Sequence, residues 1–590
     1  MHIGLLPLAL LATATLLAFP MSRYLAWIMD GKYQALPLFK RFEKRLNSGP
    51  QNWKQYTGSL LIFNTVLFVF GYLVLALQPW MPLNPEGKTL LSPSTLFNAV
   101  ASFMTNTDLQ HYAGDQHLSN FSQIFFGLTN LFASAAIGLS ALTAIIRALR
   151  SDASLGNFFL DIWRVVVYLF LPAAFIFALI FMQQGSPMTF KSDYAISTLE
   201  QGKQTIVVGP VAAFESMKML GTNGGGFYGM NSTHPFENPT GLSNFFNSLA
   251  MMIFPFSLVL MYGRMLNQRR HSLVIFIVML ILMSSTILWT IYFDTLKPNP
   301  AMLAHEARIY TLLSLKETIE IPAVSGLPVN QRMGNLEGKE LRFGTSAGAT
   351  FAALTTDVTC GAVNAEHDSL NPLAALAPMT GMWLNCFFGG KGVGMINMLL
   401  FIIIGIFLAG MMVGRTPEYL GKKIGGREVK LAILALLFHP LMILMPSGLF
   451  AATAWGMHAI SNPGAHGFSQ ILYQFSSASA NNGSAFDGLG VTYGFYNNPN
   501  PAPEAIAWDL ATGLVMIFSR FLPIIAPLAM AAFLGAKKSS PFGTGTLRVD
   551  SFTFGMLLMG TIIVVGALLF LPVAVLGPIA EHLGPIPFGG

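Results

Sequence analysis

The run Gly221-Thr222-Asn223-Gly224-Gly225-Gly226 is the stretch of this chain best suited to hold a ligand. Consecutive glycines weaken regular elements, so they are expected where the backbone adopts φ > 0 or lies close to a ligand. The preceding segment, 210–220, is typical of a short helix with a proline in its first turn and a glycine stop. Its C-terminal carbonyls would face the glycine loop, and rings of carbonyls can replace the water around a K+ ion. The pattern therefore indicates a cation site made of backbone oxygens.

Two other interpretations of this loop are open. A nucleotide-type glycine loop binds phosphate at a helix N-terminus after a strand, whereas this loop follows a helix C-terminus, so the helix dipole has the wrong polarity for phosphate. A plain extracellular turn also accounts for one glycine-rich loop. Recurrence of the same pattern elsewhere in the chain counts against that simpler interpretation.

The pattern recurs in four turns: Thr105-Asn106-Thr107, Thr222-Asn223-Gly224, Thr359-Cys360-Gly361 and Asn481-Asn482-Gly483. Aligning Asn106, Gly224, Gly361 and Gly483 gives spacings of 118, 137 and 122 residues, which indicates an internal fourfold repeat. Asparagine at the first turn is the non-glycine type that best accepts a left-handed backbone. At Gly224, we expect alanine to be strained for the same reason. The alternative to one shared pore is a set of unrelated loops in an extracellular cap.

The composition predicts the elements that must position these turns. Of 590 residues, 53% are hydrophobic and 10% charged, against about a quarter charged in soluble domains. Apolar runs of about 20 residues occur along the whole chain, so we expect an all-α polytopic membrane protein with one transmembrane domain, 1–590. Cys360 and Cys386 lie in apolar surroundings and imply no disulfide framework. The ten predicted spans are 3–19, 57–79, 118–146, 162–182, 243–263, 272–293, 394–414, 429–455, 508–535 and 552–577.

The distribution of basic residues predicts the topology. The connections 20–56, 147–161, 264–271, 415–428 and 536–551, together with Arg164 and Lys430, hold 21 of the 33 Lys and Arg residues. By the positive-inside rule these connections are cytoplasmic, which places both termini outside. The net charge of +6 therefore reflects topology, and no nucleic-acid partner is expected. The predicted division is 1–56 (N-terminal helix and cytoplasmic connection), 57–146, 162–263, 272–414 and 429–535 (four membrane-pore-membrane repeats around a pseudo-fourfold pore), and 552–590 (C-terminal helix and tail).

Nearly the whole chain resembles a known family, the potassium-channel-like A subunits of the bacterial Kdp complex, an ATP-driven K+ importer in the superfamily of K+ transporters. The matching strings are NWKQY at 52–56, MLGTNGGG at 219–226, HPFENP at 234–239, GRTPEYLGKK at 414–423 and NNGSAF at 481–486. Long strings of this kind are specific.

The resemblance implies a K+ selectivity filter, with K+ as the transported ion and no organic cofactor. The implied filter residues are Thr105, Asn106, Thr107, Thr222, Asn223, Gly224, Thr359, Cys360, Gly361, Asn481, Asn482 and Gly483, with Gln110 and Asn231 helping to line it. K+ would leave sideways through a tunnel, associated with Arg415 and Arg520, into a P-type ATPase partner of the KdpB type, which alone uses ATP. KdpC-like and KdpF-like subunits, membrane lipid and a bacterial inner-membrane location are implied as well.

Three further features allow two interpretations each. Arg520 lies inside a predicted span, where an unpaired cation indicates function unless it reaches the cytoplasmic face by snorkelling. Arg415 at a span end is equally well an interfacial anchor. The glycine-rich segment 387–394, with Gly389, Gly390 and Lys391, is either a gate loop, as the resemblance implies, or a place of close helix packing.

Several residues depart from the family pattern. Asn385 stands where glutamate is common, which puts an ion pair with Arg520 in doubt, and Lys391 adds a cation to the gate loop. Four acids near the turns would concentrate cations at an outer mouth or else be solvated surface charges: Asp108, Asp357, Glu366 and Asp487.

An enzymatic function has little support, because the sequence contains no P-loop, no Asp-Lys-Thr-Gly phosphorylation signature and no His-Glu-x-x-His zinc motif. Two transport functions are left: a pump subunit that hands K+ to an ATPase, or a Trk- or Ktr-like channel that conducts without one. The family strings favour the pump subunit.

Overall fold

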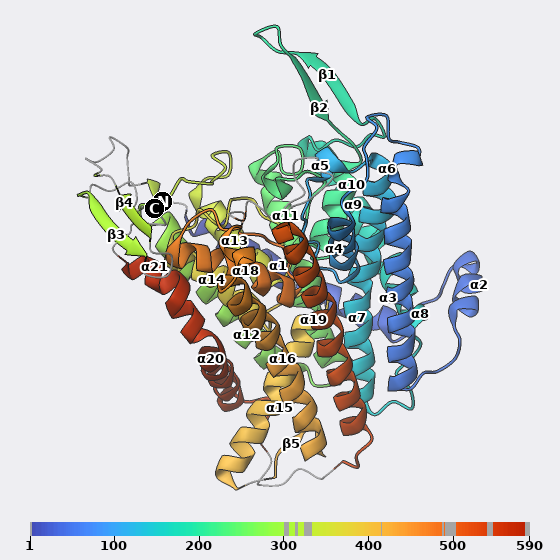
Figure 1. Cartoon of the computed structure of the whole chain (residues 1–590). Helices are drawn as coiled ribbons and strands as arrows, with labels where there is room; N and C mark the ends of the chain where they lie inside the picture. Colours follow the sequence, from blue (N-terminus) through green and yellow to red (C-terminus); the bar gives the residue numbers. More distant parts are fainter. Residues whose placement is uncertain are drawn as a thin grey trace.

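The computed structural model describes residues 3–299, 306–312, 317–321, 323, 333–414, 416–486, 489, 503–539 and 547–584. Within these residues the chain is mainly helical, with three two-stranded antiparallel hairpins in the connections. Figure 1 shows the helices gathered into one bundle with hairpins at its ends.

The described residues contain ten helical segments that are long and apolar enough to cross a membrane, which confirms the predicted number. The segments are α1 (Leu5–Met29), α3 (Trp53–Ala76), α6-η2-α7 (Asn120–Arg150), α8-η3-α9 (Phe158–Gln184), α11 (Gly241–Met265), α12-η5 (Arg269–Thr295), α15 (Val393–Val413), α16 (Gly426–Ala451), α19 (Pro503–Gly535) and α20-η8-α21 (Phe552–Leu583).

One predicted boundary is wrong. The first helix was expected to end near residue 19, but α1 continues to Met29 with Pro20 inside it. Leu25, Ile28 and Met29 are buried, and α1 packs along α11. Burial of these late apolar side chains in the bundle extends the helix beyond its hydropathy signal.

A short helix that does not cross the membrane lies between the two spans of each repeat. These four pore helices are α4 (Pro93–Met104), α10 (Val211–Leu220), α13 (Thr345–Asp357) and α18 (Gly464–Ala480). The third repeat contains a further helix, α14 (Pro372–Leu384), before α15. The remaining short helices are α2 (Pro37–Leu46), η1 (Gln78–Trp80), α5 (Gly114–His117), η4 (Asn231–Thr233) and α17 (Ala454–Met457).

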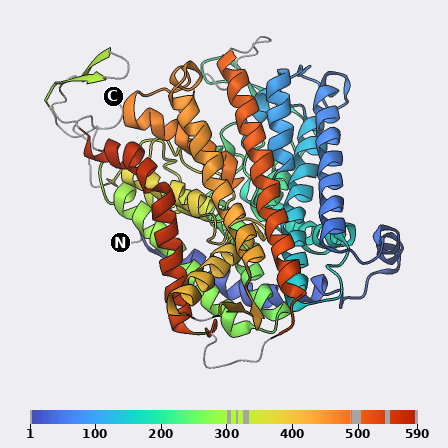
Figure 2. The same ribbon diagram turned by 60° about the horizontal axis from the view of Figure 1, so that its bottom comes forward.

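The fourth repeat closes onto the first. Helix α19 lies beside α4 and α7, and both views show it next to the blue helices of the first repeat (Figures 1 and 2). Asp509 on α19 accepts hydrogen bonds from Ser94 and Thr95 on α4, each at 2.8 Å, and its other oxygen lies 2.6 Å from His111 Nδ1. The four repeats therefore surround a common centre, as a pseudo-fourfold pore requires.

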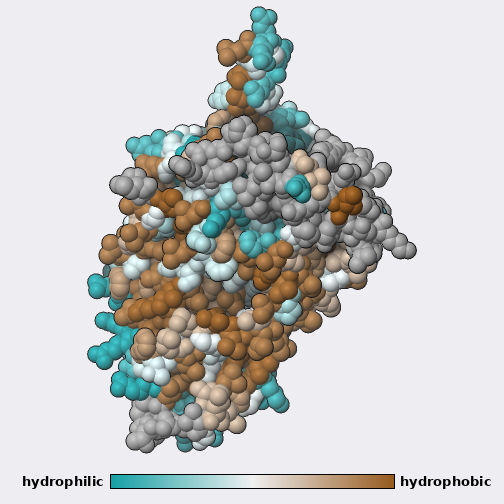
Figure 3. All heavy atoms as spheres, turned by 90° about the vertical axis from the view of Figure 1, so that its left-hand side faces the viewer, coloured by the Kyte–Doolittle hydropathy of each residue, from teal (hydrophilic) through white to brown (hydrophobic). Residues whose placement is uncertain are grey.

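The two ends of the bundle differ. Strands β1 (Asp193–Ser197) and β2 (Lys203–Val207) form a hairpin at the same end as β3 (Arg308–Leu312), β4 (Glu317–Ile321) and α21, whereas β5 (Glu418–Tyr419) lies at the opposite end and pairs with β6 (Lys422–Lys423) (Figure 1). Between the ends, apolar side chains dominate the face drawn in Figure 3, as expected for a surface that meets lipid.

The hairpin β5-β6 is fixed to the bundle by a buried lysine. Lys422 Nζ donates to the carbonyl oxygens of Leu149 and Gly535, at 3.1 and 3.2 Å. These carbonyls lie at the C-terminal ends of α7 and α19, where helix dipoles favour a positive charge. One side chain therefore joins the ends of the first and fourth repeats on this side of the bundle.

Candidate functional site

Each pore helix is followed, within two residues of its end, by a residue with a left-handed backbone. The values of φ are 58° at Asn106, 42° at Thr222, 49° at Thr359 and 50° at Asn481. We call the segments 105–108, 221–224, 358–361 and 480–483 the first to fourth corners. Every corner follows a helix C-terminus. The terminal carbonyls of four pore helices are therefore directed toward the corners.

The structure corrects the predicted alignment of the first corner by two residues. In all four corners the amide after the left-handed residue donates to a carbonyl five residues earlier: Thr107 to Ser102, Asn223 to Lys218, Cys360 to Thr355 and Asn482 to Ser477. Asp108, rather than Asn106, is therefore the counterpart of Gly224, Gly361 and Gly483. The sequence alignment had matched Asn106 by residue type, and the hydrogen bonds show which positions are equivalent.

The corners meet closely around the centre. A Cβ atom built on Gly224 would lie 2.8 Å from both Gly483 Cα and the Thr107 carbonyl oxygen. A Cβ atom on Gly361 would overlap the Asn482 carbonyl oxygen. Gly361 and Gly483 also have φ values of 89° and 104°. These positions therefore need glycine both for space and for backbone conformation. Gly224 needs it for space alone, since its φ lies outside the left-handed region, contrary to expectation.

Hydrogen bonds link the four corners into a closed ring. Asn106 Nδ2 donates to the Thr222 carbonyl at 2.9 Å, which joins the first corner to the second. Cys360 Sγ donates to the Asn223 carbonyl at 3.4 Å, and Asn482 Nδ2 donates at 3.1 Å to the carbonyl of Thr355, in the last turn of α13 before the third corner. Asn481 Nδ2 closes the ring on Thr107 Oγ1 at 2.9 Å. The amides and the thiol therefore hold the corners together and leave most main-chain oxygens free for a cation.

A cavity of about 660 Å³ lies on one side of the ring. Gly225, Gly361 and Gly483 contribute to its wall, as do the predicted pore residues Gln110 and Asn231. Gln110 is bound to the second corner's loop, because its side chain accepts from Gly226 N at 2.8 Å and donates to Gly226 O at 3.1 Å. Gln110 and Asn231 therefore line the approach to the ring rather than the ring itself.

A charged cluster supports the second corner, and the sequence interpretation missed it. Lys218 Nζ lies 2.5 Å from carboxylate oxygens of both Glu215 and Glu237, and it donates to Asn231 Oδ1 at 2.9 Å. Lys218, Glu215 and Glu237 are fully buried. The signal was available, since Glu215 and Lys218 have the spacing of an i, i+3 ion pair on an otherwise apolar short helix. A buried triad of this kind fixes the relative positions of α10 and the 231–237 segment.

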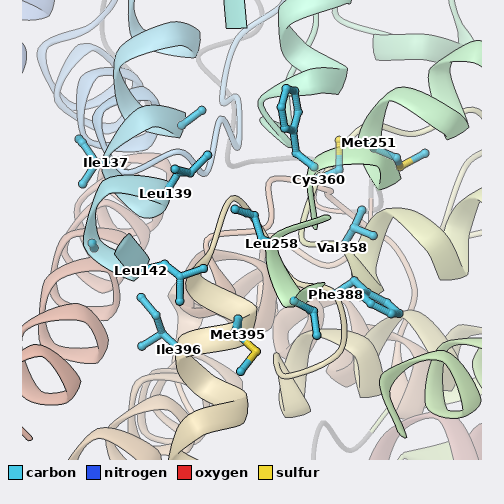
Figure 4. Packing of buried hydrophobic residues seen from close by; sticks show 14 of the residues in the cluster. Ile137, Leu139, Leu142, Met251, Leu258, Val358, Cys360, Phe388, Met395 and Ile396 are labelled. Atoms are coloured by element: carbon cyan, nitrogen blue, oxygen red, sulfur yellow. The ribbon is translucent and has the colours of Figure 1, made fainter. Parts of the chain in front are cut away.

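The glycine-rich segment between α14 and α15 lies against the third corner. Gly390 N donates to the Val358 carbonyl at 2.7 Å, and a Cβ atom on Gly389 would lie 2.7 Å from Thr359 Oγ1. Figure 4 shows Val358 and Cys360 on one side of Phe388 and Met395, within a cluster of buried apolar side chains. A Cβ atom on Gly392 would lie 2.7 Å from the Gly138 carbonyl of α7. Residues 385–392 therefore pack closely against α7, one of the two interpretations that the sequence left open, and they lie beside the ring, whereas the gate stays a prediction.

Lys391, in this loop, is 2% exposed, and its Nζ has no hydrogen-bond partner. The ammonium lies 5.4 Å from the centroid of the Phe254 ring, a distance at which a cation–π attraction operates. A second, smaller cavity of about 40 Å³ lies beside the fourth corner, with Asn385, His439, Asn481 and Ser519 in its wall. Its size is sufficient for water.

Arg520 is buried rather than snorkelling. It is 6% exposed, and its Nη2 donates to the carbonyl of Ser134 on α7 at 3.1 Å. Ser134 Oγ in turn donates to Asn106 Oδ1 at 3.2 Å, so one serine connects Arg520 to the first corner. Arg415 lies outside the described residues, and nothing about its position follows from the structure.

The four acids near the turns occupy different environments. Glu366 is exposed and lines the large cavity, as expected for an acid at the outer mouth. Asp108 and Asp357 are fully or almost fully buried, so they are neither at the mouth nor on a solvated surface. Asp357 faces α12, where Thr286 Oγ1 donates to it at 2.5 Å. Asp487 lies outside the described residues. Both cysteines are buried and free, which confirms the absence of a disulfide framework.

Comparison with known proteins relates this arrangement to one family. Residues 8–583 match the family model KdpA, described as the potassium-transporting ATPase A subunit. The chain is 44% identical over 532 residues to a potassium-transporting ATPase potassium-binding subunit of Geobacillus kaustophilus, covering 90% of this chain and 89% of the relative. It is 41% identical over 583 residues to a protein of the same name from Caldanaerobacter subterraneus, covering 97% and 98%.

Among solved structures, the potassium transporter TrkH from Vibrio parahaemolyticus is similar in fold. The TM-score is 0.50 at 13% identity, and the match covers 80% of this chain and 84% of TrkH. At this identity the likeness concerns the fold alone.

Proposed function

This chain belongs to the KdpA family of potassium-transporting ATPase A subunits, and from that premise we propose that it is the K+-binding, K+-selective subunit of an ATP-driven potassium importer. The single observation that carries the proposal is the closed ring of four corners, each following the C-terminus of a pore helix. Carbonyl dipoles and helix dipoles favour a cation there, and the hydrogen-bonded ring fixes the spacing that distinguishes K+ from other ions.

The filter consists of the twelve corner residues that the family resemblance implies, with Asp108 in addition. K+ enters from the large cavity, where Gln110 and Asn231 provide polar side chains and Glu366 adds negative charge. Dehydration in the ring costs little when carbonyl oxygens replace the ion's water.

K+ leaves the ring sideways rather than straight through. The loop with Gly389, Gly390 and Lys391 lies against the third corner, and its hydrogen bond to Val358 supports a role in closing the direct path. A buried lysine beside that path repels cations. The small cavity with Asn385 and Ser519 in its wall supports a lateral exit beside the fourth corner. Ser519 directly precedes Arg520 in the sequence. Arg520 and Arg415 shape this route by repelling K+ toward a P-type ATPase.

The partners are a KdpB-like catalytic subunit, which hydrolyses ATP, and KdpC-like and KdpF-like subunits, all in a bacterial inner membrane. Both termini face the periplasm, a proposal supported by the basic residues of the connection that contains Lys422 and Lys423. Labelling single cysteines with a membrane-impermeant reagent in intact cells tests the orientation. Labelling of a cysteine at position 423 from outside the cell would instead place both termini in the cytoplasm.

Reconstitution in liposomes tests the function. We expect the chain alone to give no ATP-dependent uphill uptake of K+, and the chain with its co-purifying ATPase to accumulate K+, because a filter lowers a barrier but supplies no work. Uphill uptake driven by ATP in the chain alone would contradict the proposal. Large passive K+ currents through the chain alone would instead favour a Trk- or Ktr-like channel.

A further inference from the structure

Asp108 occupies a position that the other three corners reserve for glycine. The shared hydrogen bonds of the corners make it the counterpart of Gly224, Gly361 and Gly483. Its backbone is left-handed, with φ of 53°, a conformation that aspartate and asparagine adopt more readily than other residues with a Cβ atom. The first corner therefore carries a carboxylate where the other three have no side chain.

The carboxylate of Asp108 is fully buried, and neither oxygen accepts a hydrogen bond of ordinary geometry, although the Asn223 amide lies beside it. A buried carboxylate is normally paired or hydrogen-bonded, because it loses its hydration on burial. The neighbouring amide of Asn223 is already engaged, since its nitrogen donates to Asn106 Oδ1 at 2.9 Å and to Ser134 Oγ at 3.3 Å. Two carboxylate oxygens without donors are suitable ligands for a cation, which prefers oxygen.

Arg520 is a basic side chain that acts on this carboxylate. Arg520 binds the Ser134 carbonyl, and Ser134 Oγ binds the first corner. Asp108 and Arg520 act on each other electrostatically, but they form no direct ion pair. Arg520 Nε also lacks a hydrogen-bond partner. The two side chains therefore lie within electrostatic range of each other near the first corner.

We propose that the Asp108 carboxylate is a direct, charged ligand for the transported monovalent cation, and that Arg520 is its counter-charge when the cation is absent. The inference rests on the proposed function, because it places the ligand in the same ring. Three corners offer the ion only main-chain dipoles, whereas the first adds a full negative charge. Asp108 and Arg520 together are neutral, so an arriving K+ leaves one excess positive charge, and Arg520 then favours departure of the ion.

Asparagine at position 108 tests the role of the charge, because it keeps the size of the side chain. In the complex purified with its ATPase, we expect Asp108→Asn to raise the K+ concentration for half-maximal ATP hydrolysis by about tenfold or more. K+-dependent thermal stabilisation of the same complex should require correspondingly more K+. Asp108→Gly should raise the half-saturating K+ concentration by a similar factor, and Asp108→Glu should retain part of the K+ affinity. Glycine suits the backbone conformation, so this variant remains informative if Asp108→Asn does not assemble.

Asp357→Asn is the matched control, because Asp357 is also a buried acid with an unpaired oxygen but faces α12. It should change the half-saturating K+ concentration by less than about twofold. Gly361→Ala separates this inference from the proposed function, since it disturbs the ring itself. If Gly361→Ala abolishes K+-stimulated hydrolysis while Asp108→Asn and Asp108→Gly match the wild type, Asp108 is not a charged ligand. If Gly361→Ala is harmless, the filter is misplaced and the proposed function is wrong.

Arg520→Gln tests the counter-charge. We expect it to lower the half-saturating K+ concentration and to slow turnover, because K+ is held by Asp108 without an opposing charge. In the double variant with Asp108→Asn, the gain in affinity should disappear. An equal effect of Arg520→Gln in both backgrounds would show that the two charges are not coupled.

Discussion

The second and fourth corners share a left-handed residue and one main-chain hydrogen bond, but they differ in support. In each, an amide after the left-handed residue donates to the carbonyl five residues earlier, Asn223 to Lys218 at 3.0 Å and Asn482 to Ser477 at 2.9 Å. At the fourth corner the Ser477 hydroxyl also accepts from Gly483 N at 3.0 Å. Lysine has no acceptor for that role, and Lys218 instead directs its ammonium to two buried carboxylates. The same main-chain hydrogen bond can therefore be supported by a neutral hydroxyl or by a charged triad.

Removing the lysine should separate the two kinds of support most strongly. We expect Lys218→Met to destabilise the protein by about 3–5 kcal/mol, because Glu215 and Glu237 are left buried without their counter-charge. Thermal or denaturant unfolding in detergent measures the loss. The matched change at the fourth corner, Ser477→Ala, removes one neutral hydrogen bond and should cost about 1 kcal/mol.

A variant with Lys218→Met, Glu215→Gln and Glu237→Gln should recover part of the lost stability, because no buried charge is left unpaired. If Lys218→Met and Ser477→Ala cost the same, the charged triad does not support the second corner.

The contact between the second and fourth corners gives a smaller effect. Alanine at Gly224 would bring its Cβ to 2.8 Å from Gly483 Cα, and backbone cannot move aside as a side chain does. We expect a cost of about 1–3 kcal/mol, which corresponds to a loss of about 5- to 140-fold in apparent K+ affinity if the cost falls on the ion-bound state. K+-dependent growth or transport measures this loss.

Gly560→Ala, in α20, is the control, because a Cβ atom there would meet no neighbour within 4 Å. Equal effects at positions 224 and 560 would remove Gly224 from the filter.

A pH-dependent effect distinguishes the fourth pore helix from the second. His466, near the start of α18, lies 2.9 Å from Asp368 and 2.8 Å from Glu581. Burial lowers the pKa of His466, but hydrogen bonds to Asp368 and Glu581 outweigh burial and raise the pKa to about 10. Because this pKa is higher in the folded state, the stabilisation is complete below about pH 6.5 and is lost as the pH rises toward 10.

We therefore expect His466→Gln to lower stability by about 1–3 kcal/mol at pH 6 and by progressively less as the pH approaches 10. Unfolding temperatures measured across this range check the trend. A penalty that does not vary with pH would mean that His466 is not a charged anchor.

Much of the fold could be predicted from the sequence because it depends on local composition. Apolar length and the placement of Lys and Arg gave ten spans, and the four turns gave the number of repeats. The end of α1 could not be predicted this way, because it depends on burial against α11, a helix more than 200 residues away in the chain.

The candidate site was predictable in residue type but not in register or partners. The sequence by itself determined which segments carry glycine, threonine and asparagine at the ends of short helices, since helix stops and left-handed residues are local features. Only the tertiary structure decided that Asp108 replaces glycine, that Lys218 meets Glu237, and that Arg520 reaches the first corner through Ser134. Those relations join residues from different helices, and their energies depend on burial, which no single stretch of sequence contains.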